Sequence, residues 1–292
     1  MPYQHGESAP RMPEWMRRPI AREGAYASVK ELLARHRLHT VCQSAKCPNQ
    51  GECFASGTAT FLVGGGVCTR GCRFCAVEPG APEPLDSTEP ERVAQAAAEL
   101  GLEHVVVTMV TRDDVPDGGA AHVAAVIRAV QAAVPGAAIE VLTSDFGGSI
   151  EALDVVLAER PDVYNHNVET VPRLYPAVRP QADYERSLRI LRHAAERGGF
   201  PVKSGLMVGL GEAYEEVVET LADLRDAGCS IVTIGQYLRP SREHLPVVEF
   251  VRPEVFAALE EEARALGFEA VASGPFVRSS YHAREAANAV RA

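Results

Sequence analysis

Two kinds of hydrophobic pattern alternate along the chain from about residue 60. Short runs rich in β-branched and apolar residues are typical of buried strands, and the segments between them carry apolar residues three and four positions apart, the period of a helix with one buried face. The predicted strands cover residues 60–66, 104–110, 139–145, 162–169, 202–210, 231–238 and 269–275. The predicted helices cover residues 88–101, 120–134, 150–160, 183–198, 214–228 and 253–267.

Such alternation predicts a parallel sheet covered by helices, either a barrel or an open doubly wound sheet. Polar clusters follow several predicted strands, as in "TRDDVPDGG" at 111–119 and "NHNVET" at 165–170. In barrels the chemistry collects on the face where the strands end, whereas an open sheet concentrates it at one crevice. We therefore expect an α/β protein with a partial (β/α)6 TIM-like barrel.

Three regions follow from this pattern. Residues 1–59 lie before the alternation and form a cysteine-rich N-terminal extension, residues 60–275 form the partial barrel, and residues 276–292 form a C-terminal tail.

Composition narrows the class of protein. The chain has 292 residues, of which 46% are hydrophobic and 23% charged, as in a soluble enzyme. Its formal net charge of −10 argues against a nucleic-acid partner, because such binding depends on a basic surface. No apolar run is long enough for a membrane span, and the N-terminus lacks the apolar stretch of a signal peptide. We expect a cytoplasmic monomer.

The cysteines are the strongest chemical signal. Six of the seven lie between residues 42 and 75, in two groups of three. The first trio, in "CTRGCRFC", is Cys68, Cys72 and Cys75; the second is Cys42, Cys47 and Cys53.

Each trio lacks a fourth ligand. A cubane iron–sulfur cluster needs one outside ligand for each of its four irons, so three cysteines leave one iron open to another molecule. The alternative for the first trio is a zinc site completed by a distant histidine such as His104 or His122. For the second trio the alternative is a structural zinc loop. The seventh cysteine, Cys229, opens a predicted strand and is expected to be a buried core thiol.

The first trio resembles the cluster motif of the radical S-adenosylmethionine superfamily, in which Phe74 fills the aromatic position. This resemblance implies a [4Fe–4S] cluster whose open iron binds S-adenosylmethionine. Reductive cleavage then gives a 5′-deoxyadenosyl radical that takes hydrogen from an unactivated carbon, which acid–base groups cannot do.

Over residues 40–283 the chain resembles the lipoyl synthases of that superfamily. The resemblance is carried by the second trio, by "RSSY" at 278–281 and by "VTRDDVPDGG", "HNVETV" and "VKSGLMVGLGE". It implies that the second trio holds an auxiliary [4Fe–4S] cluster, that Ser280 is its fourth ligand, and that this cluster is the sulfur source. A methylthiotransferase and a non-enzymatic zinc scaffold are the rival classes.

The activity implied is that of a sulfurtransferase. Two sulfurs are inserted at carbons 6 and 8 of an octanoyl group on a lysine of a lipoyl carrier domain. The implied partners are the carrier domains of 2-oxoacid dehydrogenase complexes and the glycine-cleavage H protein, a low-potential electron donor such as ferredoxin or flavodoxin, and an iron–sulfur carrier.

Several polar and glycine residues at the strand ends are candidates for binding S-adenosylmethionine. In the superfamily a glycine-rich turn lies under its methionine end; an ordinary turn is the alternative here. The other candidates lie at the end of the fourth strand and at the start of the fifth. The candidate residues are Phe74, Asp117, Gly118, Gly119, Asn165, Asn167, Glu169 and Lys203.

Three of these assignments have open alternatives. Lys203, on a barrel strand, needs a partner unless it reaches the surface along its apolar stem. Arg278 is a candidate for contacting substrate or the auxiliary site, with a salt bridge in the tail as the alternative. Ser279 and Ser280 would otherwise be solvated tail residues.

Overall fold

The computed structural model describes residues 11–17, 26–55, 59–280 and 283–291 of the chain. Its main sheet has eight strands in the order β1-β2-β5-β6-β7-β8-β9-β10. All neighbouring pairs are parallel except β1 with β2. The strands of this sheet are β1 (His39–Thr40), β2 (Thr60–Val63), β5 (His104–Met109), β6 (Ala138–Leu142), β7 (Val163–Asn165), β8 (Val202–Val208), β9 (Ile231–Gln236) and β10 (Ala270–Gly274).

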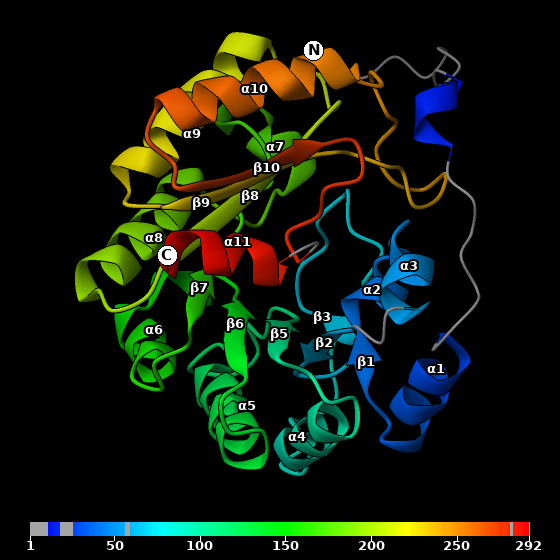
Figure 1. Cartoon of the computed structure of the whole chain (residues 1–292), viewed down its shortest axis with the longest axis vertical. Helices are drawn as coiled ribbons and strands as arrows, with labels where there is room; N and C mark the ends of the chain where they lie inside the picture. Colours follow the sequence, from blue (N-terminus) through cyan, green and yellow to red (C-terminus); the bar gives the residue numbers. More distant parts are fainter. Residues whose placement is uncertain (1–10, 18–25, 56–58, 281–282, 292) are drawn as a thin grey trace.

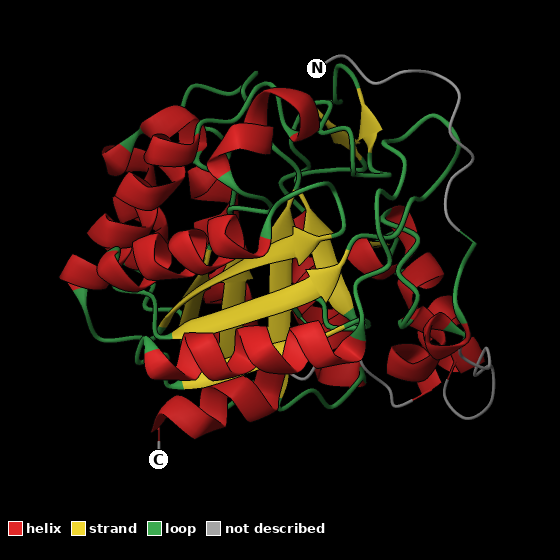
Figure 2. Cartoon of the chain, turned by 90° about the horizontal axis from the view of Figure 1, so that it is seen from above, coloured by secondary structure: helices red, strands yellow, loops and turns green. Residues whose placement is uncertain are grey.

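Helices cover the outer face of this curved sheet (Figure 1, Figure 2). Six strand–helix units run from β2 to α10, and β10 adds a seventh parallel strand, which confirms the predicted partial barrel. The helices of these units are α4 (Glu89–Glu99), α5 (Ala120–Ala133), α6 (Ile150–Leu157), α7 (Tyr175–Val178), α8 (Tyr184–Arg197), α9 (Tyr214–Asp226) and α10 (Pro253–Ala265). Short 3-10 turns are η1 (Glu14–Met16), η2 (Phe146–Gly148) and η3 (Pro172–Leu174).

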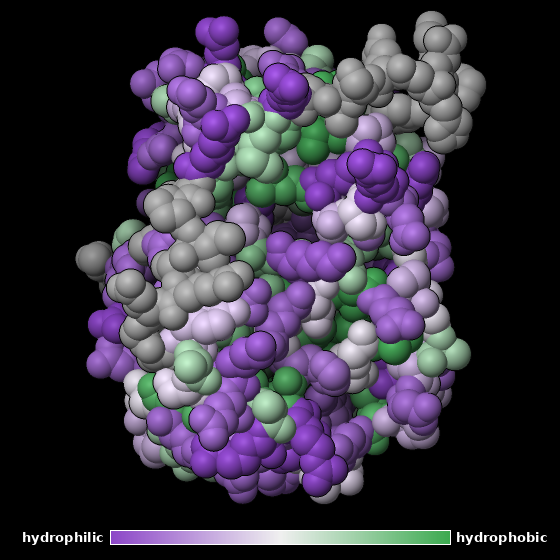
Figure 3. All heavy atoms as spheres, turned by 90° about the vertical axis from the view of Figure 1, so that its right-hand side faces the viewer, coloured by the Kyte–Doolittle hydropathy of each residue, from purple (hydrophilic) through white to green (hydrophobic). Residues whose placement is uncertain are grey.

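The N-terminal segment packs on the β2 side of the barrel. Its helices are α1 (Tyr26–Arg35), α2 (Val41–Ser44) and α3 (Gln50–Ala55). Leu33 of α1 and Phe54 of α3 are buried in the same hydrophobic core as Phe61 of β2. These apolar side chains of the N-terminal segment are thus buried against the barrel. The surface of the molecule on this side is largely hydrophilic (Figure 3).

The C-terminal segment ends in a helix, α11 (Ala283–Arg291). Ala287 of this helix packs with Val163, Ile231 and Ala270, the residues that begin β7, β9 and β10. The helix therefore covers the end of the barrel at which the strands start, and residues 275–280 form the described part of its connection to β10. A sequence tail with only one apolar stripe did not predict this helix.

Strand β7 is shorter than its hydrophobic pattern predicted. It ends at Asn165 rather than at Glu169, although Glu169 still forms an isolated bridge with Leu206 of β8. Glu169 has a φ of 66°, a left-handed conformation that a non-glycine residue in a strand does not adopt. The irregular stretch moves Asn167 and Glu169 out of simple strand alternation.

The barrel interior contains a buried ion pair. Lys203 Nζ of β8 lies 2.8 Å from Glu140 Oε1 of β6, and both side chains are 1% exposed. Burial opposes ionisation of Glu140, but the charge of Lys203 and the nearby His104 hold its pKa below the usual value. Lys203 is thus no surface lysine, and the alternative that it reaches solvent is wrong.

We expect Lys203→Met to lower the free energy of unfolding of the metal-free protein by about 3–5 kcal/mol, because it leaves an unpaired buried carboxylate. Urea unfolding measures this loss. The double variant Lys203→Met/Glu140→Leu removes both charges and should recover most of it. Wild-type stability of the single variant would contradict the pairing.

Candidate metal centre

The first cysteine trio lies on a loop that is closed by a small second sheet. β3 (Val67–Cys68) pairs in parallel with β4 (Glu78–Pro79), so that the chain leaves and returns at Cys68. The Cys68 sulfur accepts hydrogen bonds from the backbone N–H of Arg70 at 3.5 Å and of Thr111 at 3.3 Å. These two contacts hold the Cys68 sulfur in place between the loop and the end of β5.

Two salt bridges of the buried Arg70, one to the exposed Asp113 and one to the buried Asp145, anchor this loop to the barrel. Arg70 donates to both carboxylate oxygens of Asp113, at 2.7 and 2.8 Å, and also lies 2.7 Å from Asp145 Oδ1. Although burial opposes ionisation of Asp145, the hydrogen bond and charge of Arg70 lower its pKa to about 2. Arg70 and Asp145 were not predicted from the sequence. The acidic residues that end two predicted strands were the available signal.

Burial dominates the chemistry of the thiols in this trio. Burial raises the pKa of the Cys75 thiol to about 12, and the Cys72 and Cys68 sulfurs nearby add to the rise. The pKa of Cys72 is also raised by burial, while the guanidinium of Arg179 opposes the rise. The three sulfurs are therefore close enough to influence one another, next to a fixed positive charge.

Arg179 and Glu169 form the polar wall next to Cys72. The Arg179 guanidinium donates to the carbonyl oxygens of Asn167 at 2.9 Å and Val168 at 3.0 Å. Burial raises the pKa of Glu169, and Arg179 opposes that rise. Among the described residues, the buried Nε of Arg179 and Oδ1 of Asn165 have no hydrogen-bond partner. Such atoms fit a site that takes a polar ligand.

The second trio is brought together by two short helices. Cys42 lies in α2 and Cys53 in α3, with Cys47 in the turn between them. Burial raises the pKa of Cys42 to about 11 and of Cys53 to about 12, and both are raised further by Cys47.

The C-terminal loop, residues 276–280, meets the second trio. Asn49, two residues after Cys47, donates from Nδ2 to the Phe276 carbonyl at 2.7 Å. Burial raises the pKa of Cys47, and the Arg278 guanidinium opposes this rise. Arg278 is thus near Cys47, and its contact with substrate or with the auxiliary site stays a prediction. Tyr281 of the "RSSY" motif lies outside the described residues.

The same loop reaches the end of β7. Ser279 Oγ accepts a hydrogen bond from Asn165 Nδ2 at 2.8 Å and donates to Asn167 Oδ1 at 3.1 Å. The fold thereby brings together two groups that are far apart in sequence, the predicted cofactor residues Asn165 and Asn167 and the predicted cluster loop. Ser280 follows directly and is half-buried.

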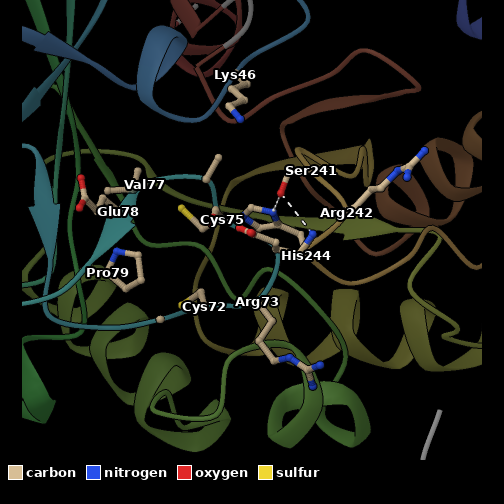
Figure 4. Close-up of a pocket in the computed structure, with 13 residues that line it drawn as sticks. Lys46, Cys72, Arg73, Cys75, Val77, Glu78, Pro79, Ser241, Arg242 and His244 are labelled. Atoms are coloured by element: carbon tan, nitrogen blue, oxygen red, sulfur yellow. Dashed lines mark hydrogen bonds between the residues drawn. The ribbon is translucent and has the colours of Figure 1, made fainter. Parts of the chain in front are cut away.

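A cavity of about 600 Å³ opens beside the first trio (Figure 4). Cys72 and Cys75 line it together with Lys46, which lies between Cys42 and Cys47 in the sequence. Next to Cys75 in Figure 4, His244 Nε2 lies 2.9 Å from the Cys75 carbonyl oxygen, and Ser241 Oγ lies 2.8 Å from His244 Nδ1. His244 was not predicted, and nothing in its local sequence singles it out.

Other predicted residues have protein partners. Asp117 accepts hydrogen bonds from the backbone of Gly119 and Ala121 and so caps α5. Gly118 and Gly119 have φ values of 63° and 86°, and a Cβ on Gly118 would lie 3.1 Å from the Phe146 ring. Phe74 packs against a small apolar cluster that includes Tyr237 and Leu245. Their contact with S-adenosylmethionine stays a prediction.

The remaining cysteine and histidines are used elsewhere. Cys229 is fully buried in the core, as expected. His104 lies 3.6 Å from Glu140, and His122 lies 2.6 Å from Glu89. The two histidines given as examples for the zinc alternative thus lie beside glutamates.

Comparison with solved structures agrees with the barrel. Methylornithine synthase (PylB) superposes with a TM-score of 0.54 at 15% identity, covering 86% of this chain and 82% of that one. HydG, a maturase of the [FeFe]-hydrogenase, gives a TM-score of 0.56 at 16% identity, covering 77% and 61%. At such identities the likeness shows the fold alone.

Sequence comparison defines the class. A family model described as the Radical SAM superfamily matches residues 62–224, more than half of the chain, which includes the first trio and β7. With the barrel around it, this match makes the protein a radical S-adenosylmethionine enzyme.

Close relatives define the family. The chain is 57% identical to a lipoyl synthase of Caldanaerobacter subterraneus subsp. tengcongensis, covering 94% of this chain and 96% of the relative. It is 52% identical to a lipoyl synthase of Rubrobacter xylanophilus, covering 98% and 89%. The chain belongs to the lipoyl synthase family, whose members use [4Fe–4S] clusters and S-adenosylmethionine.

The donor set fits these cofactors. All seven cysteines are free, and thiolate sulfur is the ligand that iron–sulfur clusters prefer. Within the described part of the chain, no three His, Cys, Asp or Glu side chains are already arranged as ligands of one metal ion. The partnerless buried atoms of Arg179 and Asn165 supply a donor and an acceptor for a polar ligand. No helix in the described part of the chain is long and apolar enough to cross a membrane.

We expect the raised pKa values to be visible in alkylation of the metal-free protein. With a pKa of about 12, Cys53 and Cys75 are neutral thiols at pH 8, so iodoacetamide should label them far more slowly in folded protein than in urea. Mass spectrometry of the labelled peptides measures both rates. The labelling rate in folded protein should still rise between pH 9 and about pH 11, where ordinary thiols have levelled off.

The same shifts affect stability. A folded pKa above the unfolded one stabilises the metal-free protein below the unfolded pKa, and this contribution is lost as the pH rises from about 9 toward the folded value. Equal labelling of folded and unfolded protein at pH 8 would contradict the burial of these thiols.

Proposed function

We propose that this protein inserts two sulfur atoms at carbons 6 and 8 of an octanoyl group that is attached to a lysine of a lipoyl carrier domain. The observation that supports this most strongly is the meeting of the C-terminal loop with the second trio, through Asn49 and Arg278, within the same barrel mouth as the first trio. A radical enzyme with one cluster would need neither the second trio nor this loop.

The roles of the two trios are part of the proposal. Cys68, Cys72 and Cys75 hold the cluster that binds S-adenosylmethionine, while Cys42, Cys47, Cys53 and Ser280 hold the auxiliary cluster. When bound, these groups supply a 5′-deoxyadenosyl radical for hydrogen abstraction and sulfide for insertion into the substrate.

Three arginines hold the loop of the first trio in place or supply positive charge next to the thiols. Arg70 holds the loop of the first trio on the barrel through Asp113 and Asp145. Arg179 and Arg278 each place a positive charge next to one trio, which favours thiolates.

Contacts with S-adenosylmethionine are proposed on the polar wall of the first trio. Asn167 and Glu169 belong to that wall, and the buried Oδ1 of Asn165 lacks a partner among the described residues. Phe74, Asp117, Gly118, Gly119 and Lys203 complete the proposed set.

The partners follow from the reaction. The family acts on octanoylated lipoyl domains, and we propose those of 2-oxoacid dehydrogenase complexes and the glycine-cleavage H protein. Cleavage of S-adenosylmethionine requires an electron from a low-potential donor such as ferredoxin or flavodoxin, and loss of sulfide requires an iron–sulfur carrier. Seven free thiols favour a reducing compartment, and we propose the cytoplasm. We further propose the division into an extension of residues 1–59, a barrel of residues 60–275 and a tail of residues 276–292.

We expect Cys72→Ala to abolish formation of 5′-deoxyadenosine while about half of the roughly eight irons of two cubane clusters remain. Anaerobic reconstitution, iron and sulfide analysis and chromatography of the cleavage product measure both effects. Cys229→Ala removes a buried thiol outside both trios and should keep all the iron. A normal rate of 5′-deoxyadenosine formation in Cys72→Ala would overturn the assignment of the first trio.

We expect Cys47→Ala to cleave S-adenosylmethionine but to transfer no sulfur to an octanoylated peptide, because the second trio is the proposed sulfur source. Mass spectrometry of the peptide detects the monothiolated intermediate and the lipoyl product. The control is again Cys229→Ala. Lipoyl product from Cys47→Ala at the wild-type yield would contradict the sulfur-donor role. The role would also be contradicted if the cluster sulfide of the wild-type protein were isotope-labelled and the label did not appear in the product.

A further inference from the structure

The C-terminal loop, residues 276–280, is held inside the barrel by contacts from three separate elements. Asn49 of the N-terminal segment binds the Phe276 carbonyl at 2.7 Å. Gly235 of β9 lies against Val277 and Arg278, and Asn165 and Asn167 bind Ser279. Each contact joins residues that are more than 40 positions apart, so the loop is placed by the whole fold and not by its own sequence.

Gly235 makes room for the loop backbone. A Cβ added at Gly235 would lie 2.3 Å from the Val277 carbonyl oxygen and 3.2 Å from Arg278 Nη1. Real Cβ atoms do not approach a backbone oxygen so closely, so a side chain here must displace the loop. A glycine in the interior of a strand is otherwise unfavourable, and this close approach accounts for it.

A second strand glycine serves the other end of the contact. A Cβ at Gly205 of β8 would lie 2.3 Å from Thr233 Oγ1 and 3.1 Å from Asn167 Oδ1. The absence of a side chain at Gly205 therefore leaves space for Thr233 and for Asn167 Oδ1. Asn167 Oδ1 accepts the hydrogen bond from the Ser279 hydroxyl.

Asn165, the other asparagine that binds Ser279, is itself held by the buried Glu140. Asn165 Nδ2 donates both to Ser279 Oγ, at 2.8 Å, and to Glu140 Oε1, at 3.2 Å. Glu140 Oε1 is itself held by Lys203 at 2.8 Å. A chain of buried polar contacts thus runs from the ion pair in the barrel to the residue that precedes Ser280.

We propose that Gly235, Asn165 and Asn167 are positioning residues that seat the C-terminal loop, so that the Ser280 hydroxyl is presented to the second trio. This inference rests on the proposed role of Ser280 as a cluster ligand. Ser279 and the Val277–Arg278 backbone, which directly precede Ser280, are held in place, and this limits the positions that the Ser280 hydroxyl can take. The restriction matters because an alkoxide is a weak iron ligand compared with a thiolate. A weak ligand must be held in place by the protein.

Two pairs of variants test the seating in the metal-free protein. Gly235→Ala adds a methyl group against the Val277 carbonyl, whereas Gly274→Ala adds one to the directly paired residue of β10, where the nearest atom, Val277 Cγ2, is 3.5 Å away. Ser279→Ala removes the hydroxyl bound by the asparagines, whereas Ser279→Thr keeps it.

The first readout is hydrogen exchange of the peptide that contains residues 276–280. Two hydrogen bonds of about 1 kcal/mol each are lost in Ser279→Ala, so exchange should accelerate by about ten-fold or more there and in Gly235→Ala. Gly274→Ala and Ser279→Thr should exchange like the wild type. Equal exchange in all five proteins would overturn the seating.

The second readout is the auxiliary site itself, in a background in which Cys68, Cys72 and Cys75 are all replaced by Ala, so that all bound iron reports the second trio. Mössbauer spectra should show the distinct iron corner in the Gly274→Ala and Ser279→Thr proteins and its loss or alteration in Gly235→Ala and Ser279→Ala. Faster exchange with an unchanged spectrum would mean that these residues only stabilise the loop, and would overturn the positioning role.

The two proposals fail separately. A wild-type protein that forms no lipoyl product from an octanoylated peptide would refute the proposed function even if the loop is seated as described. A wild-type protein that forms the product while Gly235→Ala keeps the wild-type spectrum would refute only the positioning role.

Discussion

A cubane cluster has four iron corners, and each cysteine trio of this chain supplies three ligands. The surroundings of each trio therefore depend on what is available to bind the fourth iron corner. Beside the first trio the fold leaves a cavity of about 600 Å³ and a polar wall with partnerless buried atoms on Arg179 and Asn165. Beside the second trio it places the C-terminal loop, joined by Asn49 to the segment that carries Cys47. In the proposed assignment, one corner is left for a small molecule, and the other lies next to the protein's own chain.

Bringing that loop inside the barrel makes the interior polar. Glu140, Lys203 and Asn165 are fully buried, and a buried charge without a partner costs several kcal/mol. The ion pair satisfies the charges, and Asn165 passes the network on to Ser279. An all-apolar interior would pack as well, but it would offer nothing to bind a loop of two serines. The need to bind the C-terminal loop therefore accounts for these polar residues in the barrel interior.

Sequence patterns predicted the seven parallel strands, the helices between them and both cysteine trios, because each of these is a local signal. They failed where the decisive contact is distant. Beyond the end of β7, Glu169 has a left-handed backbone and bridges the distant Leu206, and the helix α11 packs Ala287 against three strand starts. The anchor between Arg70 and Asp145 spans two strand–helix units. No local spacing encodes such pairs, although acidic residues at strand ends indicate where they gather.

Positive charges near the two cysteine trios oppose the effect of burial on the thiols. The chain has a net charge of −10 and only three lysines, yet an arginine lies next to each trio: Arg179 by Cys72 and Arg278 by Cys47. Burial alone raises the pKa values of these thiols and so disfavours the thiolates that iron requires. A buried lysine could respond by losing its own proton, whereas a guanidinium stays charged. An arginine at each trio thus keeps a positive charge where the proposed clusters need negative sulfur.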